Sequence, residues 1–274
     1  MALLSDAEVR QYHEQGFLVP SFRLDPPLVD NLRGALDRLI RDNPGVRPEK
    51  LVSAHLSGSG GRANAEGVRG QAEFLALARN ERILDAVEQL IGPDIILWGC
   101  HVFCKPAGDG HETPWHQDGH YWPIRPLATC TVWVALDPST TENGCLRVIP
   151  RSHLARTSHP HLHEDRQDVA LQQRLPEESF DATTAFDLQL QPGQMSMHDV
   201  YMIHGAQANR STQRRTGVAL RYMPGSSVFE RDLDPVQGRS GVPVAFATRP
   251  LWLLRGRDRT GRNDFNVGIK APDA

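Results

Sequence analysis

A histidine and an aspartate near the middle of the chain have the spacing of metal ligands. His116 and Asp118 flank Gln117 in an otherwise aromatic and polar run. In extended backbone, residues i and i+2 face the same side, so both side chains can reach one ion. His204, which follows an apolar run, is a candidate for the third ligand. Two histidines and one carboxylate form the facial triad of non-heme iron(II) sites, which leaves three positions of an octahedral ion open.

A cation lies a short distance beyond the third ligand. Arg215 begins a predicted strand over 216–223. If His204 ends one strand and Arg215 begins its antiparallel neighbour, both side chains point into one cavity. A guanidinium there can pair with a carboxylate through two hydrogen bonds. A chain with 12 histidines contains His-x-Asp easily by chance, and His116 could be a core residue. His204 and Arg215 together favour the metal site.

The composition is that of a folded protein without an excess of basic residues. The chain has 274 residues, a formal net charge of -3 and 39% hydrophobic residues. This charge predicts neither a nucleic-acid nor an anionic-membrane partner. No stretch approaches the roughly 18 apolar residues that span a bilayer, and the N-terminus has no signal-peptide run. We therefore expect a cytoplasmic protein, and the sequence makes no prediction of its oligomeric state.

The four cysteines do not form a metal or redox motif. None of them stands in Cys-x-x-Cys spacing, and all four lie in strand-like segments. We expect them to be buried and unpaired, as small hydrophobic side chains.

Helical patterns dominate the first 92 residues. Ser5 and Glu8 form a capping box for a helix that ends at Gly16. A short strand over 17–20 and a second helix beginning near Pro26 follow. Two further helices are predicted around 72–79 and 81–91. The Gly- and Ser-rich stretch over 53–71 is interpreted as either a lid or a plain surface loop.

Short strands separated by turn residues dominate the rest of the chain. This alternation predicts a mainly β fold with flanking helices, built as a barrel or sandwich. The predicted strands are about 94–104, 128–136, 145–149, 186–190, 194–198, 200–204 and 216–223. The polar stretch over 151–185 is too long for a turn and is interpreted as an insertion at the barrel mouth. We predict one domain over 1–274, comprising a helical part (1–92), a β core (93–224) and a C-terminal extension (225–274) with few strand signals.

Several short motifs occur in a fixed order along the chain. They are Lys105-Pro106, Trp115-His116-Gln117-Asp118, Tyr121-Trp122-Pro123, Asn143-Gly144-Cys145-Leu146 with Pro150 and Ser152-His153, then His204-Gly205, Asn209-Arg210-Ser211 and Arg215. Over about residues 5–224 this run resembles the phytanoyl-CoA dioxygenase-like (PhyH) family of Fe(II)/2-oxoglutarate-dependent oxygenases. The resemblance implies a double-stranded β-helix core, which is a jelly-roll, cupin-like fold.

The resemblance also assigns roles to individual residues. It implies that His116, Asp118 and His204 bind iron(II) and that Arg215 holds the distal carboxylate of 2-oxoglutarate, whose keto-acid end chelates the metal. Trp133 matches an aromatic residue that lines the co-substrate pocket, and Trp122 one that lies against the substrate. For both tryptophans, ordinary core packing is an alternative interpretation.

Three further polar residues are candidates for the site, and a histidine cluster suggests another. His101 and Lys105 lie on the first predicted barrel strand, where relatives often place polar groups near the co-substrate. His120 faces the metal side if the backbone stays extended beyond Asp118, so we predict substrate contact. The histidines at 159, 161 and 163 suggest a second metal site, although a solvent-exposed insertion is favoured.

The implied activity is a dioxygen-dependent oxidation of an unactivated C–H bond, by hydroxylation or by oxidative cyclisation or epimerisation. The loops expected around the site are rich in charged and polar residues, which favours a small polar metabolite or natural product over a fatty acyl chain. A zinc hydrolase or isomerase on the same barrel is an alternative, because His2Asp can bind zinc with an open water position. It leaves Arg215 unexplained. A non-catalytic barrel that binds a small molecule is a second alternative.

Overall fold

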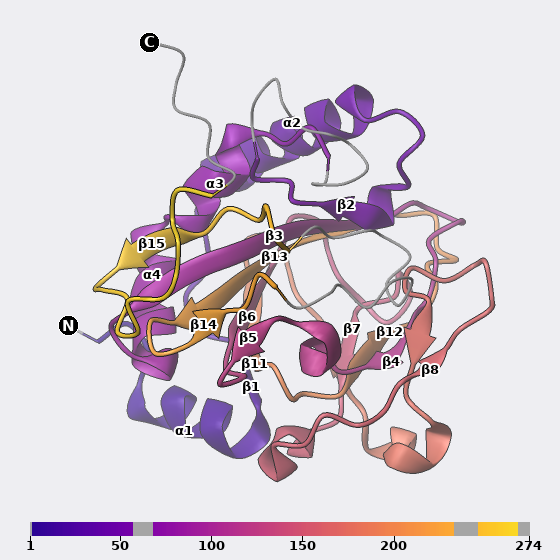
Figure 1. Ribbon diagram of the computed structural model, residues 1–274. Coiled ribbons are helices and arrows are strands. Elements are labelled where there is room, and N and C mark those ends of the chain that lie inside the picture. Colours follow the sequence, from indigo (N-terminus) through magenta and orange to yellow (C-terminus); the bar gives the residue numbers. More distant parts are fainter. Residues whose placement is uncertain (1, 57–67, 233–245, 268–274) are drawn as a thin grey trace.

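Two antiparallel sheets form the framework of the protein. The computed structural model describes residues 2–56, 68–232 and 246–267. The larger sheet has seven strands in the order β1-β11-β6-β13-β3-β15, with β2 also paired to β3, and the smaller has the order β10-β7-β12-β4. Figure 1 shows β3 and β13 as the long central strands, with β12 and β4 off to one side. This arrangement agrees with the predicted double-stranded β-helix.

The strands of the larger sheet are β1 (Phe17–Leu18), β2 (Leu51–Val52), β3 (Ile95–Lys105), β6 (Cys130–Ala135), β11 (Met195–Asp199), β13 (Arg215–Pro224) and β15 (Trp252–Arg255). Those of the smaller sheet are β4 (Thr113–His116), β7 (Leu146–Val148), β10 (Phe186–Leu188) and β12 (His204–Ala206). Two short ribbons pair β5 (Ile124–Arg125) with β14 (Val228–Phe229), and β8 (Leu162–His163) with β9 (Gln173–Arg174).

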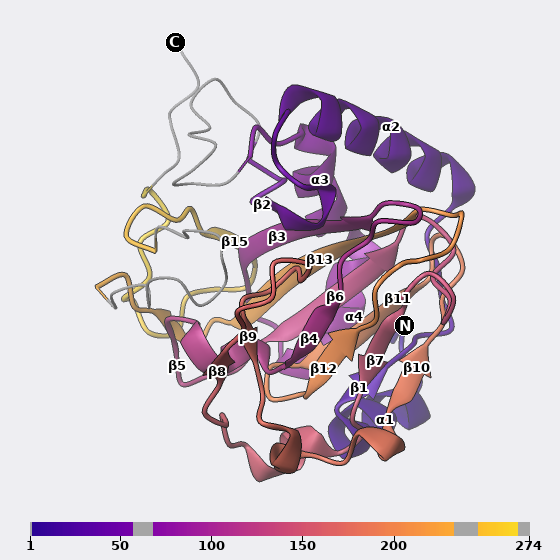
Figure 2. The ribbon, with the colours of Figure 1, turned by 90° about the vertical axis from the view of Figure 1, so that its right-hand side faces the viewer.

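Four helices cover the outer face of the larger sheet, as the turned view shows for α2 and α3 (Figure 2). They are α1 (Asp6–Gln15), α2 (Pro26–Asp42), α3 (Ala72–Ala78) and α4 (Glu81–Ile91). The predicted capping box of α1 is present, with Gly16 in the left-handed conformation at its end. Apolar residues of all four helices share one core cluster with the outward residues of β3, β6, β11 and β13. The four cysteines are buried and free, as predicted.

Period-two alternation on the central strands separates this core from the cavity. On β13, Val218, Leu220 and Tyr222 belong to the helix-facing core, whereas Arg215, Ala219 and Arg221 line the cavity. On β3 the alternation changes phase beside Gly99, where the register with β13 shifts. One strand can therefore serve a dry core on one face and a polar site on the other.

Two local predictions are wrong. The strand expected over 200–204 does not form: β11 ends at Asp199, a turn follows, and His204 begins β12 instead of ending a strand. Consequently His204 and Arg215 are not on neighbouring strands but on different sheets. The extension after 225 has more strand structure than expected, because β15 joins the edge of the larger sheet beside β3.

The insertion over 151–185 lies beside β4, where Leu175 donates its backbone N–H to the carbonyl of Trp115. Ala170 and Leu171 from this stretch line the cavity, which agrees with the predicted position at the mouth. The proposed lid residues 57–67 lie outside the described residues. None of the helices in the described ranges has the length and apolar character needed to cross a membrane.

Candidate metal and co-substrate site

The two histidines of the predicted triad form a cross-strand pair. His116 ends β4 and His204 begins β12, and the two residues stand directly opposite each other in the antiparallel register. Directly paired residues project their side chains from the same face of a sheet. The imidazole rings accordingly lie with centroids 4.2 Å apart. The pairing of β4 with β12 thus brings together two histidines that lie far apart in the sequence.

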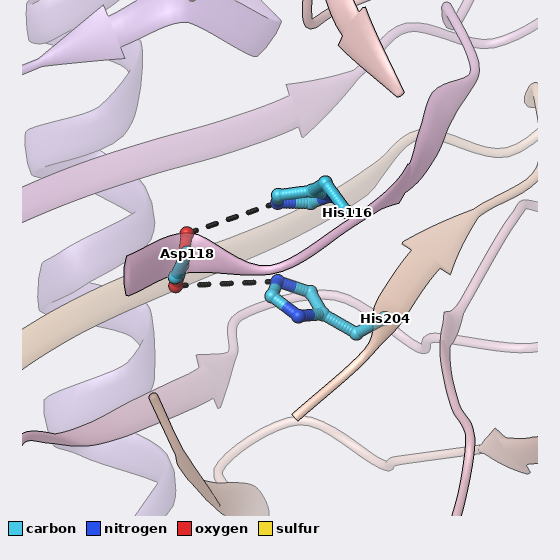
Figure 3. A group of neighbouring side chains, drawn as sticks. All are labelled: His116, Asp118 and His204. Carbon is cyan, nitrogen blue, oxygen red and sulfur yellow. Dashed lines mark ion pairs between the residues drawn. The ribbon is translucent and has the colours of Figure 1, made fainter. Parts of the chain in front are cut away.

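Asp118 completes the group from the end of the same segment as His116. Gln117 keeps extended backbone angles, so Asp118 returns to the side of His116 before the 3-10 turn over Asp118–Tyr121 begins. The Asp118 carboxylate lies 3.7 Å from Nε2 of His116 and 4.0 Å from Nε2 of His204 (Figure 3). The three ligand atoms lie within 4.8 Å of one another, and all three residues are buried.

Backbone carbonyls fix the orientation of both imidazoles. Nδ1 of His116 lies 2.9 Å from the Pro114 carbonyl, and Nδ1 of His204 lies 3.0 Å from the Met202 carbonyl. A carbonyl only accepts, so Nδ1 carries the proton in each ring and Nε2 turns a lone pair toward Asp118. Metal-binding histidines are oriented in the same way by their second nitrogen. The donor set therefore fits a divalent transition metal.

Charged neighbours keep Asp118 ionised. Burial by itself would raise the pKa of Asp118, but the Arg221 guanidinium at 3.5 Å holds that pKa well below its usual range. Burial and the neighbouring His116 lower the pKa of His204 well below 6.5. An ionised Asp118 and a neutral His204 are the protonation states in which these groups bind a metal.

Three of the four predicted co-substrate residues, Arg215, Lys105 and Trp133, lie at one end of a cavity that is open to solvent. Arg215 on β13 stands opposite Lys105 on β3 in the register, and both are buried. Trp133 on β6 lies 5.2 Å from the Arg215 guanidinium. The ring also packs over Gly217, where an added Cβ would lie only 1.9 Å from it. Gly217 thus leaves room for Trp133 beside Arg215.

Neither of these cations has a carboxylate partner among the described residues. Arg215 donates to the Gly144 carbonyl at 2.6 and 3.0 Å, and Lys105 donates to the carbonyls of Ala206 and Gln207. Burial lowers the pKa of Arg215 to about 10, and burial together with Arg215 lowers the pKa of Lys105 well below its usual value. Two buried cations without an acid suit a carboxylate ligand.

The remaining predicted residues separate into two groups. His101 and Trp122 line the cavity at the Asp118 end, where Nη1 of Arg221 lies 3.1 Å from Nδ1 of His101. His120 is not among the residues that line this cavity, and the expectation that it faces the metal is wrong. The 3-10 turn over Asp118–Tyr121 ends the extended alternation, so its ring packs against His161 instead.

Sequence reasoning missed several lining residues. Arg221 continues the period-two face that begins at Arg215, a signal that was available within the predicted strand. Phe246 and Arg249 also line the cavity, from a segment without periodic pattern. Gln117 donates to the carbonyls of Thr157 and Tyr201 and so anchors the adjoining loop.

Comparison with known proteins identifies the family. The family model described as phytanoyl-CoA dioxygenase (PhyH) matches residues 12–217. The chain belongs to the phytanoyl-CoA dioxygenase family. Members of this family are non-heme iron, 2-oxoglutarate-dependent oxygenases, and this PhyH protein is therefore an enzyme of that class, with iron(II) and 2-oxoglutarate as its cofactor and co-substrate.

Three relatives illustrate the range of this similarity. The peroxisomal phytanoyl-CoA dioxygenase of Rattus norvegicus is 26% identical, over 93% of this chain and 82% of the relative. The L-proline trans-4-hydroxylase of Streptomyces griseoviridis is 28% identical, over 81% of this chain and 87% of the relative. The solved structure of the epimerase SnoN in complex with Fe3+, alpha ketoglutarate and nogalamycin RO matches with a TM-score of 0.65 and 23% identity, over 91% of this chain and 98% of that one.

Proposed function

We propose that this PhyH protein uses His116, Asp118 and His204 to bind iron(II) and Arg215 to bind the distal carboxylate of 2-oxoglutarate. The observation that carries the proposal is the cross-strand histidine pair, whose Nε2 atoms both face a buried, ionised carboxylate. Iron(II) with 2-oxoglutarate supplies the dioxygen-dependent oxidation of a C–H bond, in which 2-oxoglutarate is split to succinate and carbon dioxide.

The residues of the chain then have separate tasks. Lys105 stands across the sheet register from Arg215 and adds a second positive charge at the co-substrate end. The Trp133 ring forms a side wall of the cavity beside Arg215 and restricts its guanidinium to the orientation that faces the cavity. Trp122 and His101, at the Asp118 end, lie where the carbon to be oxidised must approach the metal. Burial of these groups excludes water and strengthens their electrostatic interactions.

We further propose that the whole chain acts as one oxygenase domain on a small polar metabolite or natural product. The names of the proline hydroxylase and of the nogalamycin epimerase are consistent with substrates of that kind. We retain the cytoplasm as the predicted location, although the rat relative is named as peroxisomal.

Anaerobic titration tests this assignment. Iron(II) and 2-oxoglutarate are added to the wild type, His204→Ala and His153→Ala, and the visible charge-transfer band of the chelate is recorded. His153 is a matched control, because it is buried but bonds to the His13 carbonyl, outside the triad. We expect the band in the wild type and in His153→Ala and its loss in His204→Ala. Succinate formation on admission of dioxygen is a second readout. A wild type that binds iron without the band would refute the proposal and favour the zinc hydrolase alternative.

A further inference from the structure

Arg249 is a buried cation for which the described residues provide no counter-charge. It follows β14 in the chain, lines the cavity, and is only 4% exposed. Its Nη1 donates to the hydroxyl of Ser53 at 3.0 Å, and its Nε has no hydrogen-bond partner. Within the described ranges no carboxylate forms an ion pair with it. A buried guanidinium without an anion is costly, so its position calls for a ligand that supplies one.

Arg221 is the neighbouring cation, and its charge is already engaged. Nη2 lies 3.5 Å from the Asp118 carboxylate, and the guanidinium carbon lies 4.7 Å from the ring of Trp122. Burial and the positive charge of Arg221 together lower the pKa of Arg249 to about 10. Two like charges near each other, only one of them paired, create a positive potential beside the metal position.

The charges along the cavity add to this argument. The described lining residues include five cations and two anions, which are Lys50, Lys105, Arg215, Arg221 and Arg249 against Glu49 and Asp118. Glu49 is paired with Arg47 outside the cavity. The dianion 2-oxoglutarate offsets the two charges of iron(II), so bound co-substrate leaves the excess of positive charge in place.

The two ends of the cavity are too far apart for 2-oxoglutarate to occupy both. Arg215 and Arg221 are six residues apart on β13, which corresponds to roughly 20 Å between their backbone positions. A five-carbon diacid whose distal carboxylate is bound by Arg215 has its other end at the metal, so it leaves the part of the cavity lined by Arg221 and Arg249 to another ligand. Moreover, the family match ends at residue 217, so Arg221 and Arg249 both lie beyond it.

We propose that the substrate of this PhyH protein is an organic oxyanion whose carboxylate or phosphate-type group is bound by Arg249. The apolar part of such a substrate would lie against Trp98, Trp122 and Phe246, which line the same end of the cavity. Binding of the charged group there places the neighbouring carbons between Arg249 and the metal ligand Asp118. This inference rests on the proposed function, because it requires 2-oxoglutarate to occupy the Arg215 end.

Matched probes of different charge test the proposal. The protein is loaded with nickel(II) and saturating 2-oxoglutarate, which prevents turnover, and is titrated calorimetrically with benzoate, phenylphosphonate and the neutral benzamide. A charge-assisted contact in a buried site predicts that an anion binds at least roughly tenfold more tightly than benzamide. If benzoate binds more tightly than phenylphosphonate, the site prefers a carboxylate; if phenylphosphonate binds more tightly, it prefers a phosphate-type group. Equal binding of the anions and benzamide would overturn the proposal.

Variants of Arg249 locate the binding group. In Arg249→Gln we expect the preference for anions to fall by roughly tenfold or more, to near that of benzamide. In Arg249→Lys, which keeps the charge but loses the planar fork, a reduced preference should remain. Arg262→Gln is the matched control, because Arg262 is an exposed arginine of the same C-terminal region. Unchanged anion affinity in both Arg249 variants would exclude this residue as the anion site.

The same proteins separate this inference from the function on which it rests. Anaerobic iron(II) and 2-oxoglutarate should give the chelate band in both Arg249 variants, since within the described ranges no hydrogen bond or ion pair joins Arg249 to the triad or to Arg215. A retained band with lost anion preference supports both proposals. A retained band with unchanged preference rejects only the anion site. Absence of the band in the wild type rejects the proposed function itself. If Arg249→Gln does not fold, the comparison of Arg249→Lys with wild type decides the question.

Discussion

Replacement of Arg215 by glutamine tests the co-substrate end most directly. Arg215 is 3% exposed and has no carboxylate partner within the described ranges, so its guanidinium is available for a ligand. A bidentate pair consists of two charge-assisted hydrogen bonds, each contributing about 1.5–3 kcal/mol. Glutamine can retain one uncharged bond. We therefore expect Arg215→Gln to weaken 2-oxoglutarate binding by roughly 2–3 kcal/mol, which is about 30- to 150-fold in Kd.

The neighbouring Arg214 provides the control. Arg214 lies directly before β13, pairs with the Asp137 carboxylate at 3.0 Å, and does not line the cavity, so Arg214→Gln removes the same charge one residue away from Arg215. Both variants are titrated with 2-oxoglutarate in the presence of iron(II) under anaerobic conditions. Equal weakening in the two variants would mean that Arg215 acts through overall charge. No weakening in Arg215→Gln would refute its role as the carboxylate ligand.

Two further predictions concern the packing of the site and its response to pH. In Gly217→Ala the new Cβ would lie 1.9 Å from Trp133. We therefore expect the free energy of unfolding to fall by about 1–3 kcal/mol and 2-oxoglutarate to bind more weakly. Gly99→Ala is the control, because its Cβ would make an ordinary 3.7 Å contact and should change neither quantity. Burial, with a contribution from Arg249, lowers the pKa of His55 to about 3. Between about pH 3 and 6.5, His55 is therefore protonated in the unfolded chain but neutral in the folded chain. Stability is therefore lost as pH falls through this window, by up to about 1.4 kcal/mol per pH unit for this group. Urea unfolding at two pH values within this window measures the loss of unfolding free energy on acidification. We expect a smaller loss in His55→Phe, which keeps an aromatic ring against Trp252, than in the wild type. An identical loss in both proteins would contradict this.

Local spacing predicted the triad, but pairing between distant segments determined its geometry. His116 and Asp118 are adjacent enough for backbone periodicity to place them together. The alignment of His204 with His116 depends on β12 joining β4 in the smaller sheet. No local pattern specifies that pairing, and the expected strand over 200–204 placed His204 at the wrong end of a strand. The expected pairing of His204 with Arg215 used this wrong strand, whereas the choice of His116, Asp118 and His204 as ligands also rested on residue type and on the order of the family motifs.

The error for His120 has a different physical cause. Alternation predicts the side of a residue only while the backbone remains extended, and the 3-10 turn begins at Asp118 itself. Arg221 shows the opposite case, since alternation along the predicted strand puts it on the same inward face as Arg215, although this signal was not used. Arg249 had no such signal, because its segment has no regular structure and its place in the cavity depends on tertiary contacts such as that with Ser53.

The inward face of β13 explains how one strand can organise both ends of the site. Arg215 and Arg221 bracket Gly217, over which the Trp133 ring packs, and Ala219, which lines the cavity between the two positive charges. The strand direction therefore fixes which charge serves which ligand: Arg215 lies beside Trp133 and Lys105, and Arg221 lies against Asp118. If the co-substrate bound in the reverse direction, its distal carboxylate would meet Arg221, a guanidinium already paired with a metal ligand. The buried, unpaired cations at the Arg215 end thus favour one orientation of 2-oxoglutarate and leave the Arg249 end for the substrate.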